Sequence, residues 1–99
     1  MTPETKFKMK VKKYLDEIGA YHVKQFGCSL TKRGVPDILA CIGGYFVGIE
    51  LKAENGKIDP LQYKNITDIN QSGGKGMILY PSDFEDFKIL CEKLLKNKR

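Results

Sequence analysis

Two apolar segments, 37–42 and 45–53, are separated only by Gly43 and Gly44. A pair of glycines between two such segments is typical of a tight β-hairpin, because glycine adopts the positive φ angles that hairpin turns need. Side chains alternate between the two faces of a strand, and residues at equal distances from the turn lie opposite each other. The sequence therefore predicts two neighbouring antiparallel strands whose register is set by the turn.

Before the hairpin, the sequence predicts a helix and a strand. Thr2 can cap the helix, Pro3 suits its opening position and Gly19 ends it. The apolar residues of this helix recur on one stripe, so the helix should lie on a sheet. Residues 21–26 alternate weakly and predict a strand, after which a loop runs through Gly34.

After the hairpin, a second helix is expected over about 59–71 and a short buried strand over 77–80. Ser82 and Glu85 form a plausible capping box for a last helix. The hairpin pairs antiparallel, whereas the strand–helix–strand crossover should be parallel and right-handed. The predicted fold is therefore α/β, with the order α-β-β-β-α-β-α and a mixed four-stranded sheet flanked by helices.

A length of 99 residues suits one compact domain, which we expect to span 1–99 with a frayed basic tail at about 96–99. No apolar run approaches the ~20 residues that cross a bilayer, and the N-terminus reads as a helix start instead of a signal peptide. We therefore expect a cytosolic (cytoplasmic) protein that does not enter a membrane.

The three cysteines, Cys28, Cys41 and Cys91, are odd in number and widely spaced. Only His22 could add an imidazole ligand, and no CxxC motif is present. Buried reduced thiols are therefore a better interpretation than a disulfide framework or a zinc site.

The formal net charge is +5, and many of the lysines fall within 6–13 and 93–99. Clustered cations suit a polyanionic partner such as nucleic acid, because neutralising phosphates releases counterions. A basic surface that is simply solvated explains the charge equally well.

Chemistry is concentrated at one end of the hairpin. Glu50 and Lys52 share a face of segment 45–53, and Glu50 lies in an apolar run where an unpaired charge is costly. Asp37 is six residues before the glycine turn and Glu50 six after it, so the two should be cross-strand partners. Their carboxylates would then be close enough to share one divalent cation, and hard oxygen ligands favour Mg²⁺ or Mn²⁺ over zinc.

The motif formed by these residues resembles that of the PD-(D/E)xK nuclease superfamily, whose core is restriction endonuclease-like. It consists of Gly34-Val35-Pro36-Asp37 and, thirteen residues after Asp37 (50 − 37), Glu50-Leu51-Lys52. With Gly56-Lys57-Ile58 and Pro60-Leu61-Gln62 following, the chain is similar to the VRR-Nuc family. The resemblance covers about residues 2–81.

This resemblance implies a metal-dependent nuclease that hydrolyses DNA phosphodiester bonds. Asp37, Glu50 and the backbone carbonyl of Leu51 would ligate the metal, and Lys52 would position or activate the attacking water. The physics agrees, because an ammonium group near the developing oxyanion stabilises added negative charge. The alternative is an ion-pair network without a catalytic role.

Two further residues are candidates for supporting roles. Glu4 lies seven residues before Val11 and so shares the stripe of the first helix, although an acid in a first turn also suits the helix dipole. Gln62 occupies a position where VRR-Nuc proteins have a glutamine that contacts the water on the metal or the lysine. As the third residue after Asp59, it could instead complete a capping box.

The loop that leads into the site offers contacts for DNA phosphates. Ser29, Lys32 and Arg33 are the candidates, and a solvated loop is the competing interpretation.

A small domain carries one site, whereas branched DNA or two strands call for two sites related by symmetry, so we expect a homodimer. The resemblance favours four-way (Holliday) junctions or other branched DNA as the substrate. A general flap or duplex nickase remains an alternative, as does a non-catalytic basic DNA-binding module. The module would leave two acids facing phosphate, and a scaffold protein would explain neither the acids nor the basic charge.

Overall fold

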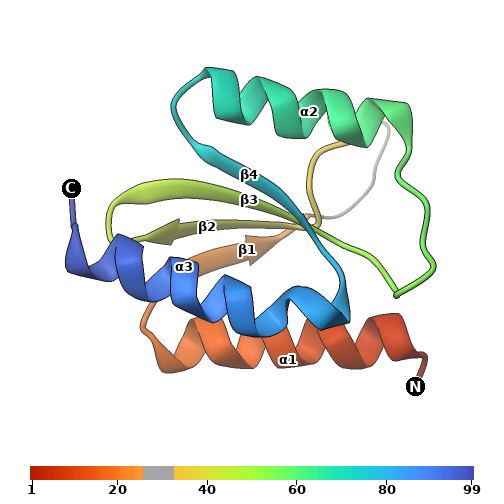
Figure 1. Ribbon diagram of the computed structural model, residues 1–99, viewed down its shortest axis with the longest axis horizontal. Coiled ribbons are helices and arrows are strands. Elements are labelled where there is room, and N and C mark those ends of the chain that lie inside the picture. The colour runs from red at the N-terminus through yellow and green to blue at the C-terminus, as the bar shows by residue number, and fades with distance from the viewer. Residues whose placement is uncertain (26–32) are drawn as a thin grey trace.

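The computed structural model of the chain describes residues 1–25 and 33–99, and it has helices on both faces of one sheet (Figure 1). The elements are α1 (Pro3–Glu17), β1 (Tyr21–Lys24), β2 (Ile38–Ile42), β3 (Tyr45–Leu51), α2 (Pro60–Gln71), β4 (Lys75–Leu79), the 3₁₀ turn η1 (Pro81–Asp83) and α3 (Phe84–Lys96). The predicted fold class, a mixed four-stranded sheet with flanking helices, is confirmed.

The four strands lie in the order β1-β2-β3-β4. The first three pair antiparallel, and β4 is parallel to β3. Gly43 and Gly44 form the turn between β2 and β3 with φ angles of 60° and 86°, which residues with a side chain rarely adopt. Ile38 pairs with Ile49, as the turn position predicts.

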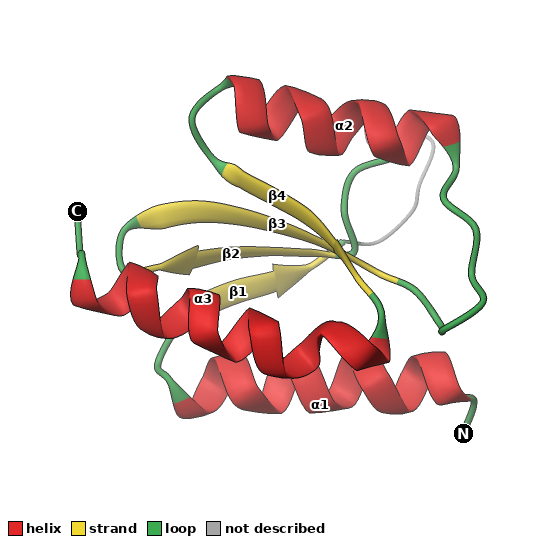
Figure 2. Cartoon of the chain, in the orientation of Figure 1, coloured by secondary structure: helices red, strands yellow, loops and turns green. Residues whose placement is uncertain are grey.

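The main core lies between the sheet and the two helices α1 and α3, which cover the same face (Figure 2). Val11 and Leu15 of α1 meet Ile49 of β3 there, and all three are fully buried. On α3, Phe87 and Cys91 complete this layer. Within residues 1–25 and 33–99, no helix is long and apolar enough to span a bilayer.

Helix α2 covers the other face of the sheet, over β3 and β4 (Figure 2). Two glycines allow it to approach closely. A Cβ on Gly48 would lie 2.6 Å from the Ile69 side chain, and one on Gly76 would lie 2.7 Å from the Ile66 carbonyl oxygen. Because those positions lack side chains, the start of α2 reaches over the C-terminal end of β3.

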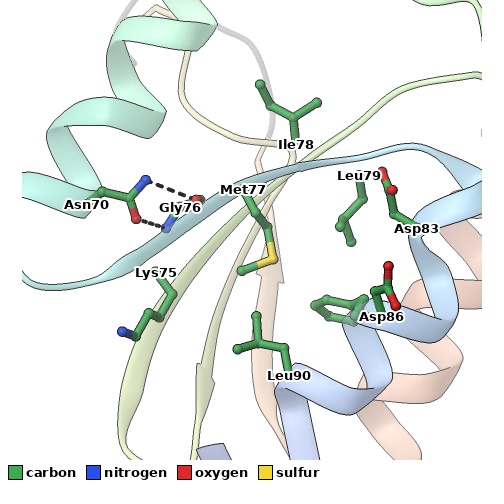
Figure 3. Close-up of a pocket in the computed structure, with 10 residues that line it drawn as sticks. Asn70, Lys75, Gly76, Met77, Ile78, Leu79, Asp83, Asp86 and Leu90 are labelled. Atoms are coloured by element: carbon green, nitrogen blue, oxygen red, sulfur yellow. Dashed lines mark hydrogen bonds between the residues drawn. The ribbon is translucent and has the colours of Figure 1, made fainter.

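The outer edge of β4 is protected by a side chain of α2. The Asn70 amide donates to the Gly76 carbonyl oxygen at 3.1 Å and accepts from its N–H at 2.8 Å (Figure 3). It therefore occupies the place of a neighbouring strand and blocks edge-to-edge pairing at this residue. The cavity beside this edge, between β4 and α3, is lined mainly by apolar side chains such as Met77 and Leu90.

Two expectations about local structure are wrong. Ser82 does not cap the last helix, because α3 begins at Phe84 after Asp83 and the Ser82 hydroxyl donates to the Glu54 carboxylate at 3.3 Å. The strand over 77–80 begins two residues earlier, at Lys75. At the C-terminus, the Arg99 N–H donates to the Gly43 carbonyl oxygen at 2.8 Å.

The cysteines divide between core and surface. Cys91 is a free, fully buried thiol, and burial raises its pKa to about 12, so it stays protonated. Cys41 is also free but exposed, because it lies on the part of the sheet that α2 leaves uncovered. The prediction of a buried thiol is thus wrong for Cys41, and Cys28 lies outside the described residues.

Candidate active site

The structure brings Asp37 and Glu50 side by side at one end of the hairpin. Ile38 pairs with Ile49 at this end of the hairpin, Asp37 directly precedes Ile38 and Glu50 directly follows Ile49, and the two carboxyl groups are close enough to interact. The Asp37 carboxylate accepts the backbone N–H of Leu51 at 2.9 Å, which holds it against β3. Both residues therefore have their positions set by backbone register and not by flexible side chains alone.

Glu50 is a charged residue in a buried position, with an exposed fraction of 2%. Its Oε2 accepts the Gln62 amide at 2.9 Å and lies 3.7 Å from the Lys52 ammonium. Its Oε1 is buried and has no hydrogen-bond partner among the residues the structure describes. Burial and the charge of Asp37 raise the pKa of Glu50 to about 7, while Lys52 opposes the rise.

These donor atoms fit a hard divalent cation. The unpartnered Oε1 of Glu50 lies beside a second carboxylate, and two such acids repel each other unless a positive charge neutralises them. The described residues contain no group of three or more His, Cys, Asp or Glu side chains that could hold a metal. A cation here would therefore have two carboxylates as its acidic ligands, which suits Mg²⁺ or Mn²⁺ and not a closed zinc site.

Gln62 completes the capping box that the sequence offered as one alternative, and it also bonds Glu50, a contact the sequence did not predict. It is in the first turn of α2, where its Oε1 accepts the Asp59 N–H at 3.2 Å and closes a capping box. Its Nε2 donates to Glu50 at the same time. One side chain thus joins the start of α2 to the buried carboxylate.

Of the other sequence candidates, Glu4 and Arg33 lie within the described residues, and neither makes a hydrogen bond or ion pair with this cluster. Glu4 is exposed in the first turn of α1, because burial of that helix's stripe begins only at Phe7. It has no ion pair with any residue of the described ranges. Arg33 is exposed in the turn before Gly34. Ser29 and Lys32 lie outside the described residues.

Asn65 is a site residue that the sequence analysis missed. It is buried, and its side-chain amide donates to the carbonyl oxygens of Arg33 at 3.0 Å and Leu61 at 2.9 Å. Next to it, Gly34 has a φ of +77°, and a Cβ there would lie 2.7 Å from the Leu61 carbonyl oxygen. Asn65 and Gly34 together clamp the segment before Asp37 onto α2. The sequence does contain one sign of its role, since Asn65 is a polar residue directly before the apolar Ile66 of an amphipathic helix.

The fold is similar to those of two solved structures, both of which belong to the PD-(D/E)xK nuclease superfamily. A solved VRR_NUC domain superposes on this chain with a TM-score of 0.72 at 23% identity, and the match covers 97% of each chain. A second match is Hjc, a Holliday junction resolvase from the archaeal hyperthermophile Archaeoglobus fulgidus. Its TM-score is 0.58 at 19% identity, over 77% of this chain and 66% of Hjc. No family model and no curated protein matches the sequence.

The resemblance that the sequence suggested, to VRR-Nuc and the wider superfamily, is therefore confirmed at the level of the fold. The site residues keep the status of candidates, because a shared fold does not by itself assign chemistry.

Proposed function

We propose that this protein is a metal-dependent endonuclease that hydrolyses phosphodiester bonds of branched DNA, with four-way junctions as the preferred substrate. The observation that carries the proposal is the buried Glu50 carboxyl group with an unpartnered oxygen beside Asp37. Such an arrangement is unfavourable for folding, so it is best explained by a ligand that neutralises it. The nuclease fold of the two solved relatives supports the same conclusion.

The proposed mechanism assigns one task to each residue. Asp37 and Glu50 would hold Mg²⁺ or Mn²⁺, with the Leu51 carbonyl as a further oxygen ligand. The Leu51 N–H points to Asp37, and the carbonyl of a strand residue points to the same side as its N–H. When bound, the ion polarises the phosphoryl oxygen and lowers the pKa of the attacking water.

The remaining residues orient the site and stabilise charge. Lys52 keeps its ammonium group near Glu50 and stabilises the negative charge that develops on the phosphoryl oxygens during in-line attack. Gln62 fixes the orientation of the Glu50 carboxylate through its amide. Glu4 would be a further acid from the first turn of α1, and Arg33, Ser29 and Lys32 would contact DNA phosphates.

We further propose that the active form is a homodimer, since cutting two strands of a junction requires two sites. The proposal of a dimer is supported by the way α2 covers the sheet, since it lies over β3 and β4. No helix of the described residues covers the apolar face over β1, β2 and the start of β3, which is made of Tyr21, Val23, Leu39, Cys41 and Phe46. Tyr21, Val23 and Phe46 are 75%, 43% and 49% exposed. We call these five residues the open sheet face.

The test uses labelled four-way junction, flap, single-stranded and duplex DNA with Mg²⁺, Mn²⁺ or EDTA. We expect the junction to be cut in the presence of either metal and not in EDTA. Asp37→Asn and Lys52→Ala should each lower the rate by at least about 100-fold. Lys93→Ala, which removes an exposed lysine of α3, is the matched control and should retain the rate.

Other outcomes identify the alternatives. Cleavage retained in both site variants would place the chemistry elsewhere. Preferential cutting of flap or duplex DNA would indicate the nickase, and binding of DNA by the wild type without any cutting would indicate the non-catalytic module.

A further inference from the structure

A groove opens beside Asp37 on the side of the site formed by α1. Lys8 and Lys12 line one wall, while Lys24 of β1 and Asp37 line the other. Its volume is about 160 Å³, several times the roughly 30 Å³ that one water molecule occupies in the liquid. The groove is therefore large enough to hold a phosphate group.

The five lysines of α1 are not equivalent. Lys8 and Lys12 are half-buried in the groove, one helical turn apart. Lys10 lies on another face and places its ammonium 4.5 Å from the centre of the Phe84 ring. Lys6 and Lys13 are exposed. Only the first pair thus faces the candidate active site.

The placement of Lys8 and Lys12 is unfavourable for the isolated chain. Two like charges four residues apart on a helix repel each other and destabilise it. Glu4 lies one turn before Lys8, yet neither lysine makes an ion pair with a carboxylate in the part of the chain that the structure describes. Lys24 also lines the groove, and the one carboxylate in its lining is that of Asp37, which itself faces the proposed cation.

The groove also contains a neutral donor. The Thr2 hydroxyl donates to the Thr5 hydroxyl at 2.9 Å, so the hydrogen of Thr5 is left to donate to an oxygen in the groove. Charge-assisted bonds from ammonium groups together with a hydroxyl are typical of contacts to the DNA backbone.

We propose that this groove binds a backbone phosphate of the DNA strand next to the phosphate that is cut. The proposal rests on the proposed nuclease function and adds Lys8 and Lys12 as positioning residues. Because Asp37 forms the boundary between groove and candidate active site, a phosphate held by these lysines sets the distance of the strand from the catalytic residues. A strand aligned in this way reacts faster than one that binds at random.

The first experiment compares two double variants that remove the same charge from the same helix. The groove variant, Lys8→Gln with Lys12→Gln, removes both α1 lysines that line the groove. The matched control is Lys6→Gln with Lys13→Gln. DNA affinity is measured by fluorescence anisotropy in EDTA over a salt series. We expect the groove variant to bind about tenfold more weakly, with a slope of log K against log[salt] reduced by about 0.9, the value for one phosphate. The control should change affinity less than about threefold and keep the slope.

The second experiment locates the phosphate. Single neutral methylphosphonate linkages are placed along the DNA, one position at a time. We expect a neutral linkage at one position to weaken DNA binding by the wild type. The same linkage should not weaken binding by the groove variant further, because the lysines and that phosphate are the two partners of one contact. Circular dichroism checks that both double variants are folded, and the single variants Lys8→Gln and Lys12→Gln replace the double one if it is not.

Equal losses in the two double variants, or a neutral linkage that both variants sense equally, would overturn the proposal. Its failure can be told from failure of the nuclease function. If the wild type never cuts DNA but Lys8 and Lys12 still determine affinity at one linkage, the proposed phosphate site is supported and the proposed nuclease function is excluded. If cutting depends on Asp37 and Lys52 while the two lysine pairs have equal effects, the nuclease function is supported and the phosphate site is excluded.

Discussion

Glu50 links the folding of this protein to pH through one carboxyl group. Its pKa rises from the ordinary 4.5 to about 7, first because burial disfavours the charged form and then because Asp37 is close. The folded state therefore binds this proton more tightly than the unfolded state. The stability that the group contributes is fully present below pH 4.5 and is lost as the pH rises to about 7.

Glu50→Gln should stabilise the metal-free protein at high pH, because an amide cannot ionise. We expect the free energy of unfolding in EDTA to rise by about 3 kcal/mol at pH 8 and by less than about 1 kcal/mol near pH 4.5. Urea denaturation at the two pH values measures both differences. Addition of Mg²⁺ at pH 8 should stabilise the wild type and leave the variant almost unchanged. A stability gap of the same size at both pH values would contradict this account.

At the scale of elements, the start of α2 organises the site. Gln62 contacts both Asp59 and Glu50, and Asn65 holds the carbonyl of Arg33. The helix can do this because Gly48 leaves room for it on the sheet. The cap of α2, the hydrogen bond from Asn65 to Arg33 and the orientation of the Glu50 carboxylate therefore all depend on how the start of α2 packs against the sheet.

Two variants separate the capping role of Gln62 from its role at Glu50. Asp59→Ala removes the N-cap and should cost about 1 kcal/mol of stability while it leaves the Gln62–Glu50 bond and most of the activity intact. Gln62→Ala removes both bonds and should also lower the cleavage rate by about tenfold or more. Thermal unfolding and junction cleavage are measured side by side. If the two variants lose activity to the same extent, Gln62 acts only as a cap.

For the whole molecule, the two faces of the sheet are covered unequally. α1 and α3 cover the main core on one face, whereas α2 lies over β3 and β4 on the other. The open sheet face is apolar and, through Gly48, lies on the same side of the sheet as Glu50. A partner bound there would lie near the active site.

The proposed dimer predicts a specific effect of charge on this face. Val23→Lys should convert a dimer into a folded monomer in light scattering, because it places an ammonium group in an apolar interface. Ile89→Lys, at an equally apolar position of α3 that is 53% exposed, is the control and should leave the mass unchanged. A wild type that is monomeric at all concentrations, or a Val23→Lys variant that remains dimeric, would exclude this surface.

By itself, the sequence determined the order of the elements, the hairpin turn and the register that brings Asp37 close to Glu50. Those features follow from local rules: glycines at a turn, side-chain alternation and the count of residues from the turn. The fold class was predictable for the same reason.

Only the tertiary structure decided which polar groups are buried and what they touch. The unpartnered oxygen of Glu50, the second bond of Gln62 and the clamp by Asn65 all depend on how closely α2 packs against the sheet. The exposure of Glu4 and Cys41 depends on how far the packing between the helices and the sheet extends. These are distances between segments far apart in the chain, and no local pattern of residues encodes them.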